Sequence, residues 1–259
     1  MVQTRVATDL GPWPDGFEPF TTHHWVTSIA FAAVALVIVW LGGRWRGTER
    51  EMMFRAGFSG AVLLSMAIMV AYWAEPVRFT WAGSLPLHMC DLLGFMVPIA
   101  LLVRTRWLST VVFFWGLGLT TQAFIQPTLV HGLRHGVYWF FWVQHTAVLA
   151  GGLYLWWVLG YRPRARDFAT MTALSLIAGI VTAAINWQTG WQYFFTGPST
   201  PGNPTIIDHL GPWPWRVGLM WILATVVMAL LWAASVLASK LVPAVNRPAT
   251  ESGSPTAIS

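Results

Sequence analysis

Charged residues are scarce in this chain of 259 residues, where Asp, Glu, Lys and Arg together make up 10% of the sequence. Soluble domains carry about 25% charged residues. Hydrophobic residues reach 56% of the chain, which includes 18 Trp. This composition excludes an ordinary soluble domain and predicts a membrane protein.

Lysine is nearly absent as well, since Lys240 is the single Lys among 15 basic residues. The net charge of +5 would by itself suit a nucleic-acid partner. The basic residues, however, stand in short loops between apolar segments, where they set topology and meet lipid headgroups. We therefore expect the membrane as a partner and no nucleic acid.

Cysteine is limited to Cys90, which excludes a disulfide within the chain. Cys90 stands between His88 and Asp91 at the start of an apolar stretch long enough to cross a bilayer. A buried free Cys is most often a small hydrophobic core residue, whereas a thiolate is a nucleophile. Cys90 is thus either a packing residue or a nucleophile.

Long apolar stretches dominate the rest of the sequence. A membrane-spanning helix needs about 20 mostly apolar residues, and seven stretches reach or approach this length. They are Trp25–Gly43, Met52–Trp73, Leu85–Val103, Trp107–Ile125, Val137–Leu159, Phe168–Trp187 and Pro214–Leu237. This predicts an all-α, polytopic membrane protein with a seven-helix domain over residues 23–240.

Basic residues orient the seven helices. Eleven of the 15 Lys and Arg fall on one side of the predicted membrane and four on the other. Because basic loops stay in the cytoplasm, we expect a multi-pass protein of the cell membrane with its N-terminus outside and its C-terminus in the cytoplasm. Residues 1–22 would form an extracytoplasmic segment. Residues 241–259 would form a disordered cytoplasmic tail, because they are rich in Pro, Ser, Thr and Ala.

Polar residues within the predicted spans gather at one depth. Polar and ionisable groups are costly in lipid and usually face the interior of the helix bundle. In the predicted topology they fall in the outer half of the bilayer or at its outer edge, which predicts one polar cavity near the outer leaflet. The residues expected there are His24, His88, Cys90, Asp91, Gln122, Gln144, His145 and Asn186.

Several of these residues also have a purely structural interpretation. Asp91 near a helix N-terminus would interact favourably with the helix dipole. His145 needs a partner in lipid, which a hydrogen bond within the core would supply. Outside the spans, His131 and His135 have the spacing of a pair of metal ligands, but their loop setting and the intervening Gly132 favour a solvated loop.

Helix geometry restricts the chemistry of the cysteine. At about 100° per residue, Asp91 shares a helix face with His88, whereas Cys90 points nearly the opposite way from His88. A base for Cys90 must therefore come from another helix, and His145 is the candidate at the same depth. The imidazole would take the thiol proton and later protonate the leaving alkoxide.

This arrangement predicts acyl transfer through a thioester, without a metal or another cofactor. An outer-leaflet cavity lined by apolar side chains would suit acyl chains, so a phospholipid or another acyl lipid is the expected substrate. Cys90 and His145 are the expected catalytic residues. The residues expected to bind the substrate are His24, His88, Asp91, Gln122, Gln144 and Asn186.

Four patterns stand near the outer ends of the predicted helices. They are the opening Phe20-x-x-x-His24, the run Leu85-Pro-Leu-His-Met-Cys90, the pair Gln144-His145, and Asn186 before a Pro-rich loop. Together they resemble the YwaF-like integral membrane family over about residues 20–238. That family is related to the eukaryotic transmembrane protein 164, reported as a cysteine-dependent acyltransferase that makes ether phospholipids. The resemblance implies that Cys90 matches its nucleophile and His145 its histidine.

Other functions use the same residues differently. A metal-dependent membrane hydrolase would bind zinc through His24, His88, Asp91 and His145, although no HExxH-type motif lies within a span. A transporter or binding protein for a small or lipid ligand would need polar residues that continue into the inner half, where the sequence places few. A purely structural subunit would leave His145 and Asp91 unexplained.

Overall fold

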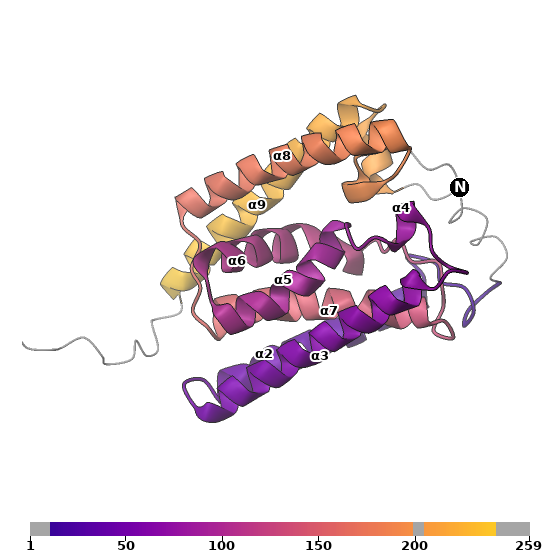
Figure 1. Ribbon diagram of the computed structural model, residues 1–259. Coiled ribbons are helices and arrows are strands. Elements are labelled where there is room, and N and C mark those ends of the chain that lie inside the picture. The colour runs from indigo at the N-terminus through magenta and orange to yellow at the C-terminus, as the bar shows by residue number, and fades with distance from the viewer. Residues whose placement is uncertain (1–10, 199–204, 242–259) are drawn as a thin grey trace, which may run out of the picture.

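The computed structural model describes residues 11–198 and 205–241 of the chain. These residues form helices and one isolated antiparallel bridge between Gly16 and His131, and they contain no strand. The long helices lie side by side and connect at the two ends of a bundle (Figure 1). In chain order the elements are α2 (Thr22–Arg44), α3 (Glu49–Ala74), α4 (Trp81–Ser84), α5 (Met89–Val103), α6 (Arg106–Val111), η1 (Val112–Leu119), η2 (Thr120–Phe124), α7 (Gly136–Trp157), α8 (Ala165–Thr189), η3 (Tyr193–Phe195), η4 (Ile206–Leu210) and α9 (Trp215–Leu241).

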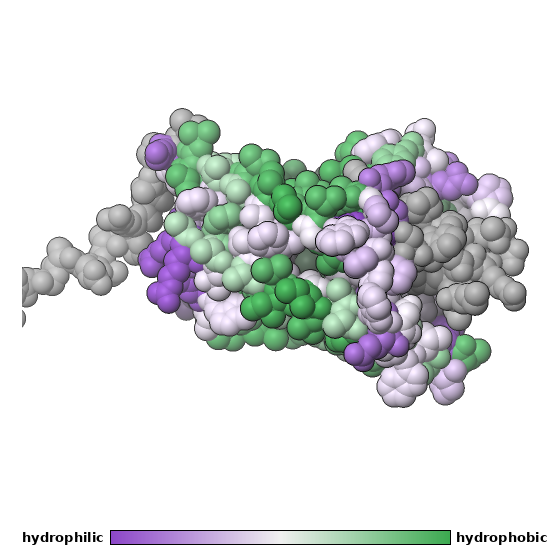
Figure 2. Space-filling view, turned by 90° about the horizontal axis from the view of Figure 1, so that it is seen from above, coloured by the Kyte–Doolittle hydropathy of each residue, from purple (hydrophilic) through white to green (hydrophobic). Residues whose placement is uncertain are grey.

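Five stretches of the described chain are long and apolar enough to cross a membrane. They are α2, α3, Trp81–Val103, α8 and Trp215–Lys240. Only 6% of the apolar window of α8 and of α9 is buried inside the protein, and Figure 2 shows the apolar band on one face, with hydrophilic residues toward its ends. Soluble monomers rarely expose apolar patches of this extent. The structure therefore confirms an all-helical membrane protein with several candidate spans.

The other two predicted spans have a different character. The segment predicted over Trp107–Ile125 is divided into α6, the π-helix η1 and the 3₁₀-helix η2. The segment predicted over Val137–Leu159 forms the continuous helix α7, whose Gln, His, Tyr and Trp residues lower its mean hydropathy. Both lie within the bundle, and neither is among the five candidate spans. The count of seven spans and the orientation of the termini stay predictions.

Helix α7 occupies the centre of the bundle, where it contacts α2, α3, α5 and η1. Glycines permit its close approach to two of these neighbours. A Cβ atom on Gly151 would lie 2.4 Å from Cγ1 of Val97 in α5, and one on Gly152 would lie 2.6 Å from Cγ of Leu117 in η1. Larger side chains would push the helices apart, so these two glycines set the distances at which α7 packs on α5 and η1.

A buried ionic cluster lies near the C-terminal end of α5, at the opposite end of that helix from Cys90. The Nε atom of Arg55 donates to Oε1 of Glu51 at 2.9 Å, and its Nη1 donates to the carbonyl oxygen of Leu101 at 2.5 Å. The hydroxyl of Tyr154 donates to the same Glu51 oxygen at 2.7 Å. Glu51 and Arg55 are each 7% exposed. These bonds join α3, α5 and α7 at this end of the bundle.

The ends of the predicted membrane domain lie close to described helix ends, since α2 begins at Thr22 and α9 ends at Leu241. Most of the tail predicted over residues 241–259 lies outside the described residues, as do residues 1–10 of the predicted N-terminal segment. Between Gly11 and Phe20, the described part of that segment contacts the loop before α7, through the bridge to His131 and a hydrogen bond from the Phe17 amide to the Val130 carbonyl oxygen.

Candidate functional site

A short non-helical segment leads into the helix that carries Cys90. Leu85 is extended, because a residue before a proline, here Pro86, is disfavoured from the helical region. His88 is extended as well and forms the N-cap of α5, with φ −66° and ψ 151°. The first turn of α5 then carries Cys90 and Asp91. Since His88 precedes the helix, the angle predicted between His88 and its neighbours does not apply.

The carboxylate of Asp91 connects the thiol to the central helix. Its Oδ1 accepts a hydrogen bond from Nε2 of Gln144 at 2.9 Å. The same oxygen accepts a weak bond from the Cys90 thiol, with Sγ at 3.9 Å. Cys90 and Asp91 are half-buried, and Gln144 is buried. The structure thus brings together three of the predicted site residues from α5 and α7 around one carboxylate oxygen.

Tyr193 in η3 covers the histidine before the helix. The ring centroids of Tyr193 and His88 lie 4.9 Å apart in an edge-to-face arrangement. The Tyr193 hydroxyl donates to the carbonyl oxygen of Trp81 at 3.0 Å, and the residue is buried. Burial, together with the nearby charge of Asp91, raises the pKa of Tyr193 above its ordinary value, so its phenol stays protonated at neutral pH. Tyr193 is not among the predicted site residues, because it lies outside every predicted span.

Asn186 at the end of α8 holds Tyr193 in place. Its Oδ1 accepts from the Tyr193 amide at 3.0 Å, and its Nδ2 donates to the Tyr193 carbonyl oxygen at 2.8 Å and to Oγ1 of Thr196 at 2.9 Å. Asn186 is fully buried. Both amide hydrogens of its side chain are used within this loop, so the structure shows Asn186 positioning Tyr193 and offers no free N–H for a substrate.

Replacing Asn186 with Ala is expected to release the loop around Tyr193. The change leaves the buried Tyr193 amide without its acceptor, at a cost of about 1–3 kcal/mol, whereas the Tyr193 carbonyl oxygen keeps its hydrogen bonds from Thr196. Hydrogen exchange measured by mass spectrometry should show the Tyr193 amide exchanging about tenfold faster or more. Gln188→Ala, on an exposed residue of the same helix end, is the matched control and should leave this exchange unchanged. Equal exchange in wild type and Asn186→Ala would contradict the positioning role.

His145 is buried in α7, one residue after Gln144. Its Nδ1 lies 2.7 Å from the carbonyl oxygen of Phe141. A carbonyl oxygen only accepts, so Nδ1 carries the proton and Nε2 keeps its lone pair in the neutral ring. Within the described chain no hydrogen bond joins His145 to Cys90. The predicted base therefore has the correct tautomer for accepting a proton at Nε2 but makes no direct contact with the thiol.

The structure places two other predicted site residues apart from this group. His24 is fully buried, with Nδ1 accepting from the Phe20 amide at 2.9 Å and Nε2 3.2 Å from the carbonyl oxygen of Phe124. Nε2 of His24 thus joins α2 to the end of η2, while Nδ1 binds the backbone just before α2. Gln122 in η2 is exposed, and none of the described hydrogen bonds reaches its side-chain amide. None of the described hydrogen bonds joins either residue to Cys90, Asp91 or Gln144.

A zinc centre on the predicted ligands finds no support in this geometry. In residues 11–198 and 205–241, no three side chains of His, Cys, Asp or Glu come close enough together to hold a metal ion. His24, one of the four proposed ligands, has both ring nitrogens engaged with backbone groups.

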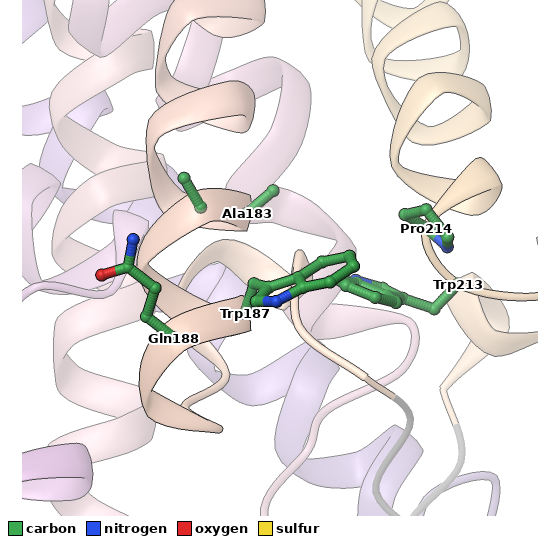
Figure 3. A pocket seen from close by; sticks show the side chains of 6 residues that line it. Ala183, Trp187, Gln188, Trp213 and Pro214 are labelled. Atoms are coloured by element: carbon green, nitrogen blue, oxygen red, sulfur yellow. The ribbon is translucent and has the colours of Figure 1, made fainter.

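Two open, mainly apolar pockets lie elsewhere on the described surface. One of about 320 Å³ is situated between the C-terminal end of α8 and the start of α9, where the ring centroids of Trp187 and Trp213 lie 4.7 Å apart. Figure 3 shows these two rings next to each other, with Pro214 on the side of α9. The other, of about 280 Å³, lies between α2, η2 and Leu149 of α7. Neither pocket is lined by Cys90 or Asp91, so the predicted cavity around the thiol stays a prediction.

Comparison with known proteins identifies the family of the chain. The model of the TMEM164 family matches residues 19–232. The match begins before α2 and extends into α9, so it includes every candidate site residue. A search of curated proteins and a search of solved structures each found no match. The family match confirms the predicted relation to transmembrane protein 164, and the chain belongs to the TMEM164 family.

Proposed function

We propose that this protein is a lipid acyltransferase or acyl hydrolase of the cell membrane, with Cys90 as its nucleophile and His145 as its base near the outer leaflet. The observation that carries the proposal is the contact of the Cys90 thiol with Asp91, whose carboxylate is held by Gln144. A cysteine that merely packed would lie among apolar atoms. The family resemblance, which implies a cysteine-dependent acyl transfer, supports the same residue.

The proposed reaction has two balanced steps. In the first, the base takes the Cys90 proton, and the thiolate attacks the carbonyl carbon of an acyl ester. The ester C–O bond breaks, the base returns its proton to the leaving alcohol, and the acyl group remains on sulfur as a thioester. In the second, a lipid alcohol or water attacks the thioester and restores the thiol. A lipid alcohol makes the protein a transferase, and water makes it a hydrolase.

Two groups compete for the role of the base. His145 has a free lone pair on Nε2, because its Nδ1 proton is directed to Phe141. Accepting the thiol proton would require the His145 ring or Cys90 to change rotamer, since the two are not hydrogen-bonded. Asp91 is already in contact with the thiol. We assign the base to His145, since an imidazole is better matched than a carboxylate to proton transfer at neutral pH, and we assign Asp91 to orienting the thiol.

An oxyanion would form on the carbonyl oxygen during both steps. Gln144 uses one of its two amide hydrogens on Asp91, so the second is available for a hydrogen bond to this oxygen. A preorganised donor of this kind stabilises the developing charge. Gln144 therefore serves as the proposed oxyanion donor, and the exposed apolar faces of the surrounding helices allow an acyl chain to approach from the lipid.

Trapping the thioester tests the proposal directly. The purified chain in detergent is mixed with a diacyl phospholipid and examined by intact mass spectrometry. We expect a mass increase of one acyl chain that hydroxylamine removes and that Cys90→Ala does not acquire. His145→Gln should form the adduct much more slowly than Asp91→Asn. An adduct that survives in Cys90→Ala would overturn the nucleophile, and the reverse order of the two base variants would move the base to Asp91.

The same purified protein in detergent distinguishes acyl transfer from the two alternative functions, a metal-dependent hydrolase and a transporter. A metal-dependent hydrolase would form no acyl adduct and would lose activity to a chelator. A transporter would move solute without any dependence on Cys90. Glu51 and Arg55 form a further polar cluster near the C-terminal end of α5. Their hydrogen bonds are made to each other, to Tyr154 and to Leu101, so this cluster does not continue a transport pathway from the site.

A further inference from the structure

Two histidines flank the turn that begins the central helix. His131 lies in the loop before α7, and His135 is the N-cap of that helix. Their ring centroids are 5.4 Å apart. Two imidazoles that bind one tetrahedral metal ion through nitrogens at 2.0–2.1 Å have centroids about 5.3 Å apart. The observed separation of the ring centroids is therefore compatible with a shared metal ion.

The backbone of this turn is fixed on both sides by described contacts. The Gly132 amide donates to the carbonyl oxygen of Asp15 at 2.8 Å, and the His135 amide donates to the carbonyl oxygen of Gly132 at 3.0 Å. A Cβ atom at Gly132 would lie 2.1 Å from the Pro14 carbonyl oxygen. The close packing against the N-terminal segment requires a glycine there, and it holds the two histidines at a constant spacing.

An unpaired nitrogen points to a ligand at this turn. Nε2 of His135 is buried and has no hydrogen-bond partner within the described residues. A buried polar atom of this kind needs a water molecule or an ion to satisfy it. The intervening Arg134 pairs with the carboxylate of Asp15 at 3.2 Å, which offsets its positive charge near the histidines.

We propose that His131 and His135 form a binding site for a divalent transition metal such as zinc, at the N-terminus of α7. Imidazole is a ligand that zinc, copper and nickel prefer. The described chain supplies these two ligands and no third His, Cys, Asp or Glu, so water completes the coordination. The ion would join the loop before α7 to the start of the helix that carries Gln144 and His145, and it would stabilise this end of the bundle.

Zinc titration of the intact, tag-free chain in detergent tests the site, with binding followed by isothermal calorimetry. We expect one zinc ion per chain, and no stoichiometric binding in His131→Gln or in His135→Gln, because each variant leaves a single protein ligand. His209→Gln is the matched control, because His209 is exposed in η4, and it should bind zinc as the wild type does. Thermal unfolding provides a second readout, since zinc should raise the Tm of the wild type and of His209→Gln alone.

Three results would overturn the site. They are the absence of stoichiometric zinc binding to the wild type, equal binding in His131→Gln or His135→Gln, and an equal loss in His209→Gln. In each case water would remain as the partner of His135. These outcomes are independent of acyl transfer, because neither histidine takes part in the proposed reaction.

Discussion

Replacing Cys90 with Ala is expected to lower the rate of phospholipid acyl turnover by about 10³-fold or more, because covalent catalysis has no other nucleophile here. Cys90 is the only cysteine of the chain, and no second thiol can substitute for it. The substitution removes one sulfur atom from a half-buried position and leaves the Asp91–Gln144 hydrogen bond intact. Turnover is measured as transfer of a labelled acyl chain from a diacyl phospholipid to a lysophospholipid, with release of free fatty acid recorded in parallel.

Two companion variants distinguish a lost nucleophile from a disturbed helix. Met89→Leu changes a neighbouring side chain of α5 that packs on the core and should keep most of the activity. Cys90→Ser keeps a hydroxyl in place of the thiol and should retain far less activity than wild type, since an alcohol ionises much less readily. Full turnover in Cys90→Ala would exclude Cys90 as the nucleophile and leave it as a packing residue.

The helices of this protein could be predicted where a continuous apolar composition is enough to define a membrane span. The predicted stretches Trp25–Gly43 and Met52–Trp73 correspond to α2 and α3 within a few residues, because continuous apolar runs permit few other structures in a membrane. The start of α5 was predicted less well. Pro86 keeps the preceding residue extended, and a hydropathy pattern contains no information on this backbone conformation. The division of the next span into α, π and 3₁₀ helix depends on packing, which the sequence pattern does not report.

Part of the candidate site could be predicted from the sequence, but its individual contacts could not. Asp91 and Gln144 are 53 residues apart in sequence, the predicted topology placed both at one depth, and the structure joins them by a hydrogen bond. The hydrogen bonds of Asn186 depend instead on the path of an irregular loop, which carries Tyr193 back toward His88. A usable signal existed, because a buried Asn at a helix end commonly binds nearby backbone groups. The same argument from depth included His24 and Gln122, whose side chains are directed elsewhere.

Removing the carboxylate of Glu51 is expected to be the most destabilising single change at the opposite end of the bundle. Glu51→Ala leaves the buried Arg55 guanidinium without its counter-charge and the Tyr154 hydroxyl without its acceptor. Breaking a buried ion pair by removing one partner costs about 3–5 kcal/mol, because an uncompensated charge stays buried. Denaturant titration of the protein in detergent micelles, followed by its helical circular dichroism, measures the change in the free energy of unfolding.

A neighbouring acidic residue is the matched control for this measurement. Glu49 lies in the same first turn of α3, where both carboxylates interact favourably with the helix N-terminus. Glu49 is exposed, whereas Glu51 is buried. Glu49→Ala therefore removes the same charge from the same helix end but breaks no buried pair, and it should cost less than about 1 kcal/mol. The difference between the two variants isolates the buried contacts from the helix dipole.

The double variant Glu51→Leu/Arg55→Met tests whether the unpaired charge of Arg55 causes the loss of stability in Glu51→Ala. Replacing both partners of a buried pair with apolar residues is often neutral, because no charge remains to be compensated. The double variant should therefore recover much of the stability that Glu51→Ala loses, although the Leu101 carbonyl oxygen and the Tyr154 hydroxyl stay unpaired. If the double variant is less stable than Glu51→Ala, the pair makes a net favourable contribution of its own. This end of the bundle would then be held by the ion pair and not by the apolar packing around it.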